Sequence, residues 1–414
     1  MPSHTTDTRF NNYSEIELFN QKYPIDSCTN ITPRITSKLN KQLHNKRGHP
    51  LFLTRQRIQN YFYNNFIKSS GNPLFAVFDN ISPIVTPYQN FDSLLFPHDH
   101  PGRLATDTYY INSKHLLRSH ITAHDEELIK MGFNAFLSVG DVFRRDEIDF
   151  SHYPAFHQLD GLRLFSEQEL FHGIKDPTGL KLFENGNRTN DKQDKHTVDA
   201  SKLVEFDLKH VLVGITQKLF GKDIKYRWVD CYFPFTHPSW ELEIFYENEW
   251  MEVLGCGVLE QAIAINAGAG NKVGWAFGIG LDRLAMIQYH IPDIRLLWSE
   301  DRRFLDQFNV DNPETKIVYK PISKYMCRQT DISFWITDSF VSSDFYDLVR
   351  SVGGDNIERV ALIDIYSDVK TARTSHCYTI TFQHMERVIS VEEVKEIHNH
   401  IALLAEQQLG VQIR

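Results

Sequence analysis

The stretch FRRDEIDFSHYPAFHQLDG, residues 143–161, concentrates side chains that can bind a charged, flat ligand. We read it as two strands joined by a turn at Pro154, so that Arg144 and Asp146 share one face of the first strand. On the second strand the corresponding face carries Phe156, Gln158 and Asp160. An arginine can bond a phosphate with two parallel hydrogen bonds, and a phenylalanine ring offers a stacking plane to a purine. The stretch therefore predicts a site for a nucleotide beside an amine, although charge alone equally fits a surface hairpin with salt bridges.

A second candidate lies at GIGLDR, residues 278–283, where a strand is expected to lead into a helix. Glycines allow a ligand to approach the backbone, and the helix N-terminus adds its partial positive charge to that of Arg283. Both features attract phosphate groups. Without further context, the hexamer also fits a plain strand-to-helix turn.

The spacing within these two stretches resembles the signature motifs of the class II aminoacyl-tRNA synthetases. Phe143-Arg144-x-Asp146 followed by His152-x-x-x-Phe156-x-x-x-Asp160 is similar to the second motif, and GIGLDR is similar to the third, with Asp282 where the family usually has Glu. The resemblance implies an ATP site. It assigns Arg144 to the α-phosphate, Asp146 and Phe156 to adenine, His152 and Arg283 to the outer phosphates, and Glu252 to Mg²⁺ or the nucleotide.

Further stretches resemble the single-chain mitochondrial phenylalanyl-tRNA synthetases within that class. They are NFDSLLFPHDHPGR (90–103), LLRSHITAHD (116–125), DCYFPFTHPSWELEI (230–244), ISKYMCRQTDISFW (322–335) and SHCYTITFQHMER (375–387). The resemblance implies a phenylalanine pocket in which Phe233 and Phe235, expected on one strand face, flank the phenyl ring above Ala276. His120, Thr122, Gln158 and Asp160 are implied for the amino and carboxyl groups. The family more often has Ser and Glu in place of Thr122 and Asp160.

The implied reaction uses ATP and Mg²⁺ to form phenylalanyl-adenylate and then esterifies the 2′-hydroxyl of the terminal adenosine of tRNA(Phe). Two other functions stay open: a catalytically silent RNA-binding paralogue, and a tRNA-independent class II ligase that adenylates an aromatic amino acid. The first is expected to lose Arg144, Phe156 or Arg283, and the second to lack an anticodon-binding domain. All three residues are present.

Composition sets limits on location and partners. The net charge of −9 over 414 residues gives no support to a nucleic-acid partner, so the expectation of tRNA binding comes from the resemblance. No apolar run is long enough for a membrane span, and five scattered cysteines without a C-x-x-C pair indicate free thiols in a reducing compartment. The resemblance implies a monomer in the mitochondrial matrix, although the N-terminus does not read as a transit peptide.

The pattern of elements predicts an α+β protein. We expect an N-terminal extension (1–35), a class II catalytic domain with an antiparallel sheet flanked by helices (36–305), a linker (306–320) and a ferredoxin-like anticodon-binding domain (321–414). Residues 36–66 are predicted as two helical pieces, the second capped by Thr54, and residues 186–197 as an exposed insertion.

The C-terminal part is predicted to follow the order β-α-β-β-α-β, with a capping box of Ser390 and Glu393 before its last helix. Residues 318–414 contain ten Lys and Arg against thirteen Asp and Glu, so we expect base stacking and few phosphate contacts. Deletion of this domain is expected to abolish aminoacylation while leaving amino-acid-dependent ATP–pyrophosphate exchange largely intact.

Overall fold

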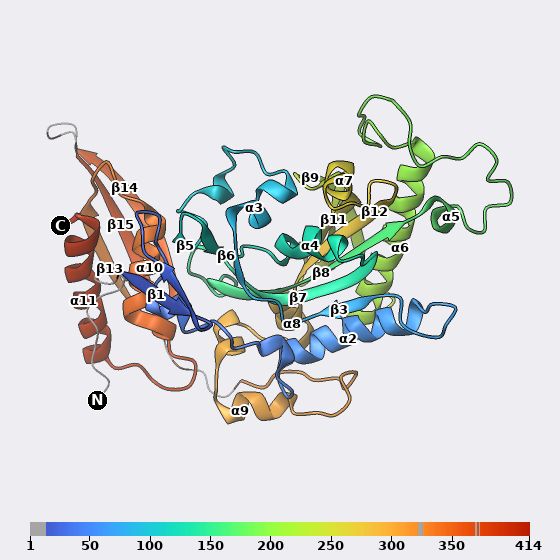
Figure 1. Ribbon diagram of the computed structural model, residues 1–414. Helices are drawn as coiled ribbons and strands as arrows, with labels where there is room; N and C mark the ends of the chain where they lie inside the picture. The colour runs from blue at the N-terminus through green and yellow to red at the C-terminus, as the bar shows by residue number, and fades with distance from the viewer. Residues whose placement is uncertain (1–13, 322–324, 326, 369–370, 372) are drawn as a thin grey trace.

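The two largest of four clusters of buried hydrophobic side chains in the described part of the chain mark its two main parts. The computed structural model describes residues 14–321, 325, 327–368, 371 and 373–414; the larger cluster lies in the N-terminal part and the smaller in the C-terminal part. The two parts lie side by side (Figure 1). Helices together with mainly antiparallel sheets confirm the predicted α+β class. Residues 1–13 of the predicted extension lie outside the described residues.

The N-terminal part is built on one seven-stranded sheet. Its strand order is β3 (Ala76–Phe78), β7 (Ala135–Phe143), β8 (Ala155–Phe165), β12 (Val273–Gly280), β11 (Glu249–Leu259), β10 (Thr236–Tyr246) and β9 (Tyr226–Phe233). All neighbours are antiparallel except β3 and β7. The hairpin predicted around residues 143–161 is formed by β7 and β8, and the connection between them contains Pro154.

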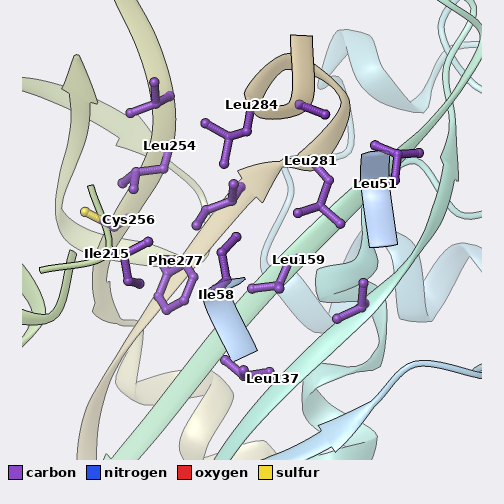
Figure 2. Packing of buried hydrophobic residues seen from close by; sticks show 14 of the residues in the cluster. Leu51, Ile58, Leu137, Leu159, Ile215, Leu254, Cys256, Phe277, Leu281 and Leu284 are labelled. Carbon is purple, nitrogen blue, oxygen red and sulfur yellow. The ribbon is translucent and has the colours of Figure 1, made fainter. Parts of the chain in front are cut away.

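Three helices cover one face of this sheet: α2 (Pro50–Asn65), α6 (Val198–Phe220) and α8 (Leu281–Tyr289). Figure 2 shows how Ile58 of α2, Ile215 of α6 and Leu284 of α8 meet the sheet side chains Leu159 and Phe277. Burial of these apolar side chains, at about 25 cal/mol per Å², holds the helices against the sheet. One face of the sheet is therefore closed.

The opposite face carries shorter elements. They are the small sheet β4 (Ile84–Val85), β6 (His115–Leu117) and β5 (Tyr110–Asn112), with helices α3 (Pro87–Asn90), α4 (Asp125–Lys130) and α7 (Gln261–Asn266). Arg118, which is 1% exposed, attaches this layer to β7 because its guanidinium donates to the Asp141 carboxylate at 2.8 Å and to the Asp141 carbonyl at 2.7 Å. A Cβ atom at Gly140 would come within 2.1 Å of the same guanidinium, so the strand needs a glycine there.

The C-terminal part is a four-stranded antiparallel sheet with two helices on one face (Figure 1). Along the chain its elements are β13 (Arg328–Trp335), α10 (Ser342–Gly353), β14 (Ile357–Asp368), β15 (Arg373–Phe382), α11 (Val391–Leu409) and β16 (Gln412–Ile413). The spatial order β14-β15-β13-β16 confirms the predicted ferredoxin-like arrangement.

Smaller elements complete the chain: the hairpin β1 (Glu15–Leu18) and β2 (Gln21–Pro24), and helices α1 (Pro33–Thr36), α5 (Glu167–Leu170) and α9 (Arg302–Leu305). Phe308 and Tyr319, from the segment predicted as a linker, belong to the larger hydrophobic cluster. The domain limits expected from the sequence stay a prediction. Among the described residues, no helix combines the length and apolarity needed to cross a membrane.

The helix prediction for residues 36–66 was partly wrong. Only the second piece is a helix of several turns, and its N-cap is His49, whose ring accepts a hydrogen bond from the Leu51 N–H. Thr54 lies inside α2, is fully buried and donates its hydroxyl to Gln288. The helix begins at Pro50, a residue type favoured at the first helical position, and therefore starts before the predicted N-cap Thr54.

Two further local predictions need correction. The polar segment 186–197 is not simply exposed, because Gln193 and His196 are buried and Gln193 donates to the carbonyl of Leu259 at 2.9 Å. The predicted capping box is only half formed. Ser390 accepts from the Glu393 N–H at 3.1 Å, but the Glu393 carboxylate pairs with Arg387 instead of returning to the cap.

The buried ion pair of Arg118 gives a prediction about stability. Arg118→Met should lower the free energy of unfolding by about 3–5 kcal/mol, because Asp141 would keep a buried and uncompensated charge. Urea unfolding measures the loss, with the exposed Arg302→Met as matched control, expected within about 0.5 kcal/mol of wild type. Equal stability of the two variants would contradict this role for Arg118.

Candidate active site

Two adjoining cavities open on the face of the large sheet that the long helices leave uncovered. The first measures about 490 Å³ and the second about 290 Å³, and Arg144, Asp146, Gln158 and Glu252 line both. Every candidate residue from the sequence lies on a wall of one or both. The first cavity also has His120, Thr122, Asp160, Phe233, Phe235 and Ala276, and the second also has His152, Phe156 and Arg283.

The pairing of β8 with β12 brings the two motifs together. Gln158 lies opposite Gly280 and Asp160 lies opposite Gly278 in the antiparallel register. A Cβ atom at Gly278 would come within 2.9 Å of the Asp160 carboxylate. The glycine therefore leaves room for Asp160 to lie over the neighbouring strand, at the floor of the first cavity.

Arg144 lies directly after β7, where the two cavities join. Its Nε donates to the carbonyl of Ser119 at 2.9 Å, and its guanidinium lies over the Phe156 ring at 5.2 Å from the ring centre. Both contacts orient the arginine fork toward the shared wall. The hairpin thus presents a cation and an aromatic ring together. The expected alternation of Arg144 and Asp146 on a strand was wrong, however, because β7 ends at Phe143 and both residues lie in the loop that follows it.

Asp160 is a buried carboxyl with one oxygen available. Thr122 donates its hydroxyl to Oδ2 at 2.6 Å, while Oδ1 has no hydrogen-bond partner among the described residues. Burial raises the pKa of Asp160 to about 7, and the Thr122 hydrogen bond and the Arg144 charge oppose this shift only in part. A buried carboxylate of this kind is suited to a cationic ligand, which would restore its ionised form.

His120 is buried beside an aromatic group that the sequence reasoning missed. Burial lowers the pKa of His120 to about 3, so its ring is neutral. The ring stacks on Phe96 at 5.6 Å and 6°, and Phe96 lies 6.0 Å from Phe235. Phe96 belongs to the stretch 90–103, in which no residue spacing distinguishes a wall residue of the cavity from a core phenylalanine.

The aromatic pair was predicted on one strand face, and this geometry was wrong. Phe233 ends β9, whereas Phe235 lies in the turn before β10, together with Pro234, which also lines the cavity. The two rings are nearly parallel, 5.7 Å apart at 12°. A Cβ atom at Gly255 would come within 2.6 Å of the Phe233 ring, so a glycine makes room for it.

Asp282 has a clear structural role in place of the longer side chain usual in the motif. Its carboxylate accepts from the His157 N–H at 2.6 Å and lies 3.2 Å from His157 Nδ1, with both side chains buried. The contact joins the first turn of α8 to β8. Arg283, the next residue, is exposed at the second cavity.

His152 also lines the second cavity, and its Nδ1 lies 2.8 Å from the Asp149 carboxylate. This hydrogen bond raises the pKa of His152 and favours its charged form. Together with Arg283 it gives the second cavity two cationic walls. Such a cavity is suited to a polyanion.

Two carboxylates could hold a divalent cation. The first is Glu252, which lines both cavities. The second is Glu241, a residue that the sequence did not indicate. Burial and the nearby charge of Glu252 raise the pKa of Glu241. In the described part of the chain, no group of three or more His, Cys, Asp or Glu side chains forms a metal site. Mg²⁺ commonly takes one or two protein carboxylates and completes its shell with phosphate oxygens and water, so these residues fit it.

The fold is that of a class II aminoacyl-tRNA synthetase, as two family models indicate. A family model described as "tRNA synthetases class II core domain (F)" matches residues 35–175 and 196–308. A second, described as "Ferredoxin-fold anticodon binding domain", matches residues 323–414. Together they cover most of the residues of the two hydrophobic clusters.

Similar proteins indicate which family within the class II synthetases the chain resembles. The mitochondrial phenylalanine–tRNA ligase of Mus musculus is 53% identical over 97% of this chain and 89% of its own length. A protein of Drosophila melanogaster named probable phenylalanine–tRNA ligase, mitochondrial, is 48% identical over 97% and 92%, and the mitochondrial enzyme of Saccharomyces cerevisiae is 35% identical over 96% and 95%. The chain belongs to the family of mitochondrial phenylalanine–tRNA ligases.

The raised pKa of Asp160 predicts a pH-dependent cost in stability. The unfolded chain ionises this carboxyl near its ordinary pKa of about 3.9, but the folded chain does so only near pH 7, so the group lowers stability increasingly as pH rises between these values. Asp160→Asn should therefore stabilise the protein more at pH 8 than at pH 5, by about 2.5 kcal/mol. Urea unfolding at both pH values measures it, and a gain that does not grow with pH would contradict the pKa shift.

Proposed function

We propose that this chain attaches phenylalanine to tRNA(Phe) in two steps, through a phenylalanyl-adenylate, in the mitochondrial matrix. The observation that carries the proposal is the shared wall of the two cavities, where Arg144, Asp146, Gln158 and Glu252 face both. A carboxylate held in the first cavity meets the α-phosphate of a nucleotide held in the second. The two reactants are thus brought into one site.

In the first step a carboxylate oxygen of phenylalanine attacks the α-phosphorus of ATP. A new P–O bond forms, the bond to the bridging oxygen breaks, and pyrophosphate leaves with its electron pair. Arg144 neutralises the charge that develops on the α-phosphate, and its contact with Ser119 holds it in place before reaction. Positioning and charge neutralisation supply the rate without a covalent enzyme intermediate.

The first cavity selects the amino acid. The phenyl ring packs against Phe233 and Phe235, with Ala276 as the floor. The ammonium group binds the free oxygen of Asp160, assisted by Gln158, while Thr122 and the neutral His120 orient the amino and carboxyl groups. Pairing with the ammonium group offsets the cost of ionising Asp160 inside the protein.

The second cavity holds the nucleotide. Adenine stacks on Phe156 with its amino group toward Asp146, and Arg283 and His152 bind the outer phosphates. Mg²⁺, held by Glu252 and the phosphates, would supply further charge neutralisation. The cationic walls draw the triphosphate tail away from the amino acid, which leaves the α-phosphate at the shared wall.

In the second step the 2′-hydroxyl of the terminal adenosine attacks the adenylate carbonyl and AMP leaves. The C-terminal sheet offers a surface for the anticodon on the face opposite its helices, because Trp335 alternates with Phe334 of the core. Arg373 and Arg414 lie over the Trp335 ring at 4.8 and 5.2 Å, and Arg414 lies over Tyr366 at 4.9 Å. Stacking planes with local cations bind single-stranded bases despite the negative charge of the domain.

We propose that the protein acts as a monomer.

The proposed reaction is tested by phenylalanine-dependent ATP–pyrophosphate exchange on the purified chain. We expect exchange with phenylalanine, weaker exchange with tyrosine, and a loss of at least about a hundredfold in Arg144→Ala, because the α-phosphate loses its charge partner. The exposed Arg302→Ala serves as matched control and should keep wild-type exchange. Absence of exchange with any aromatic amino acid would contradict the proposal.

The anticodon surface is tested separately. Trp335→Ala should raise the KM for tRNA(Phe) in aminoacylation about tenfold, because base stacking on an aromatic side chain contributes roughly 1–3 kcal/mol. Exchange without tRNA should be unchanged, and Trp335→Phe should recover most of the affinity. An unaltered KM for tRNA in Trp335→Ala would exclude this surface.

A further inference from the structure

The loop between β7 and β8 has two sides with different partners. On one side it carries Arg144, Asp146 and His152 to the nucleotide cavity. On the other side it contacts the C-terminal domain along most of its length. The residues of the C-terminal domain that make these contacts line neither of the two cavities.

Arg145 begins these contacts. Its guanidinium, 3% exposed, pairs with Asp347 at 2.6 Å and with Asp344 at 2.7 Å, both on α10. Its backbone N–H donates to the Asp107 carbonyl at 3.0 Å. The residue directly after Arg144 is therefore fixed by a helix of the other domain.

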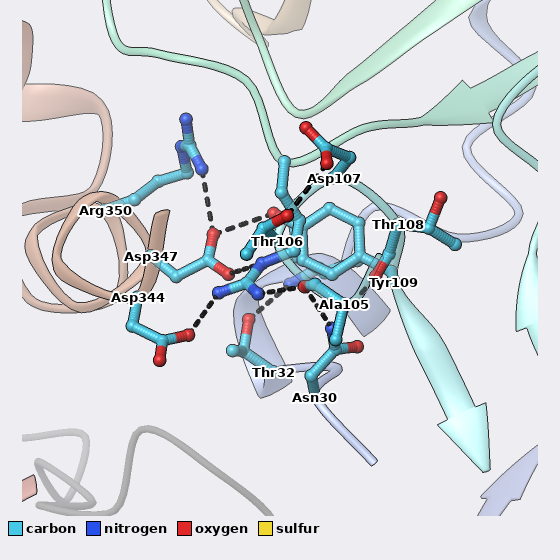
Figure 3. Close-up of polar contacts among 12 residues, drawn as sticks. Asn30, Thr32, Ala105, Thr106, Asp107, Thr108, Tyr109, Asp344, Asp347 and Arg350 are labelled. Carbon is cyan, nitrogen blue, oxygen red and sulfur yellow. Dashed lines mark hydrogen bonds and ion pairs between the residues drawn. The ribbon is translucent and has the colours of Figure 1, made fainter. Parts of the chain in front are cut away.

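Asp347 is the centre of the contact. Besides Arg145, its carboxylate accepts from Tyr109 at 2.8 Å and from Arg350 at 2.9 Å (Figure 3). Arg350 in turn donates to the backbone carbonyl of Asp146 at 2.7 Å. The backbone that carries the proposed adenine contact is thus held by a side chain of α10, and that side chain is oriented by Asp347.

The same domain holds the loop further along. The Ile148 carbonyl accepts from the Val360 N–H at 3.1 Å, and the Ile148 side chain is buried in the hydrophobic cluster of the C-terminal domain. Tyr153, next to His152, donates to the Asp355 carboxylate at 2.9 Å. The loop is therefore held at Arg145, Ile148 and Tyr153, each within two residues of a proposed nucleotide-binding side chain.

We infer that Asp347 and Arg350 are positioning residues for ATP, acting through the β7–β8 loop, so that the C-terminal domain forms part of the adenylation machinery. The inference rests on the proposed function. It replaces the expectation that adenylation is largely independent of this domain. A displacement of about 1 Å in a positioning contact can cost on the order of a hundredfold in rate, and no residue between Arg145 and Tyr153 belongs to a strand that could hold the loop instead.

The experiment is phenylalanine-dependent ATP–pyrophosphate exchange by the full chain carrying Asp347→Asn, with KM measured for both substrates. We expect the KM for ATP to rise about tenfold or more and the KM for phenylalanine to stay within about twofold, because the phenylalanine contacts lie mainly on strands. Asp338→Asn, the same change at an exposed turn of the same domain, should match wild type. A structural defect alone would lower kcat without raising the KM for ATP.

Arg350→Lys provides a second variant that keeps the charge beside Asp347. A single ammonium group cannot reproduce the fork that reaches both Asp347 and the Asp146 carbonyl, so the KM for ATP should rise in the same direction by a smaller factor. If Asp347→Asn does not fold, the KM for ATP of Arg350→Lys tests the inference in its place. If the variants have the KM for ATP of the wild type, the inference is overturned but the proposed function is not. If the wild-type chain itself shows no exchange, both the proposed function and the inference are overturned.

Discussion

The register of the large antiparallel sheet is the constraint on which the rest of the site depends. A shift of β8 by one residue against β12 would turn Asp160 away from the cavity and bring His157 to the place of Gln158, because side chains alternate between the faces. Two contacts fix this register beyond the backbone ladder. Asp160 occupies the space above Gly278, and Asp282 holds His157 on the buried side.

The buried polar groups of the site lower the stability of the folded chain. Arg118 is compensated by Asp141, whereas Asp160 and His120 are held in the forms that burial favours, a carboxyl with a raised pKa and a neutral ring. Such groups destabilise the folded chain unless a ligand or a neighbour pairs with them. The hydrophobic packing of α2, α6 and α8 on the other face of the sheet provides the stability that offsets this cost.

Residue spacing identified the side chains that line the two cavities better than it predicted how these side chains are arranged. The hairpin, the glycine-rich strand and the ferredoxin-like order were read from alternation and turn residues, which are local signals. The nearly parallel rings of Phe233 and Phe235, the stacking of Phe96 on His120 and the contact of Asp347 with Arg145 depend on turns and on neighbours distant in sequence. Periodicity contains no information on such contacts. The N-cap at Thr54 failed for a related reason, since the tertiary partner Gln288 satisfies that hydroxyl.

The central claim is that one continuous site, joined at Arg144, Asp146, Gln158 and Glu252, holds both halves of an adenylate. A crystal structure of the full chain with a non-hydrolysable phenylalanyl-adenylate analogue tests it most directly. The account predicts the phenyl ring beside Phe233 and Phe235, the ammonium group on Asp160, and adenine on Phe156. An analogue bound with its adenine in the larger cavity, or with its ammonium group away from Asp160, would contradict it.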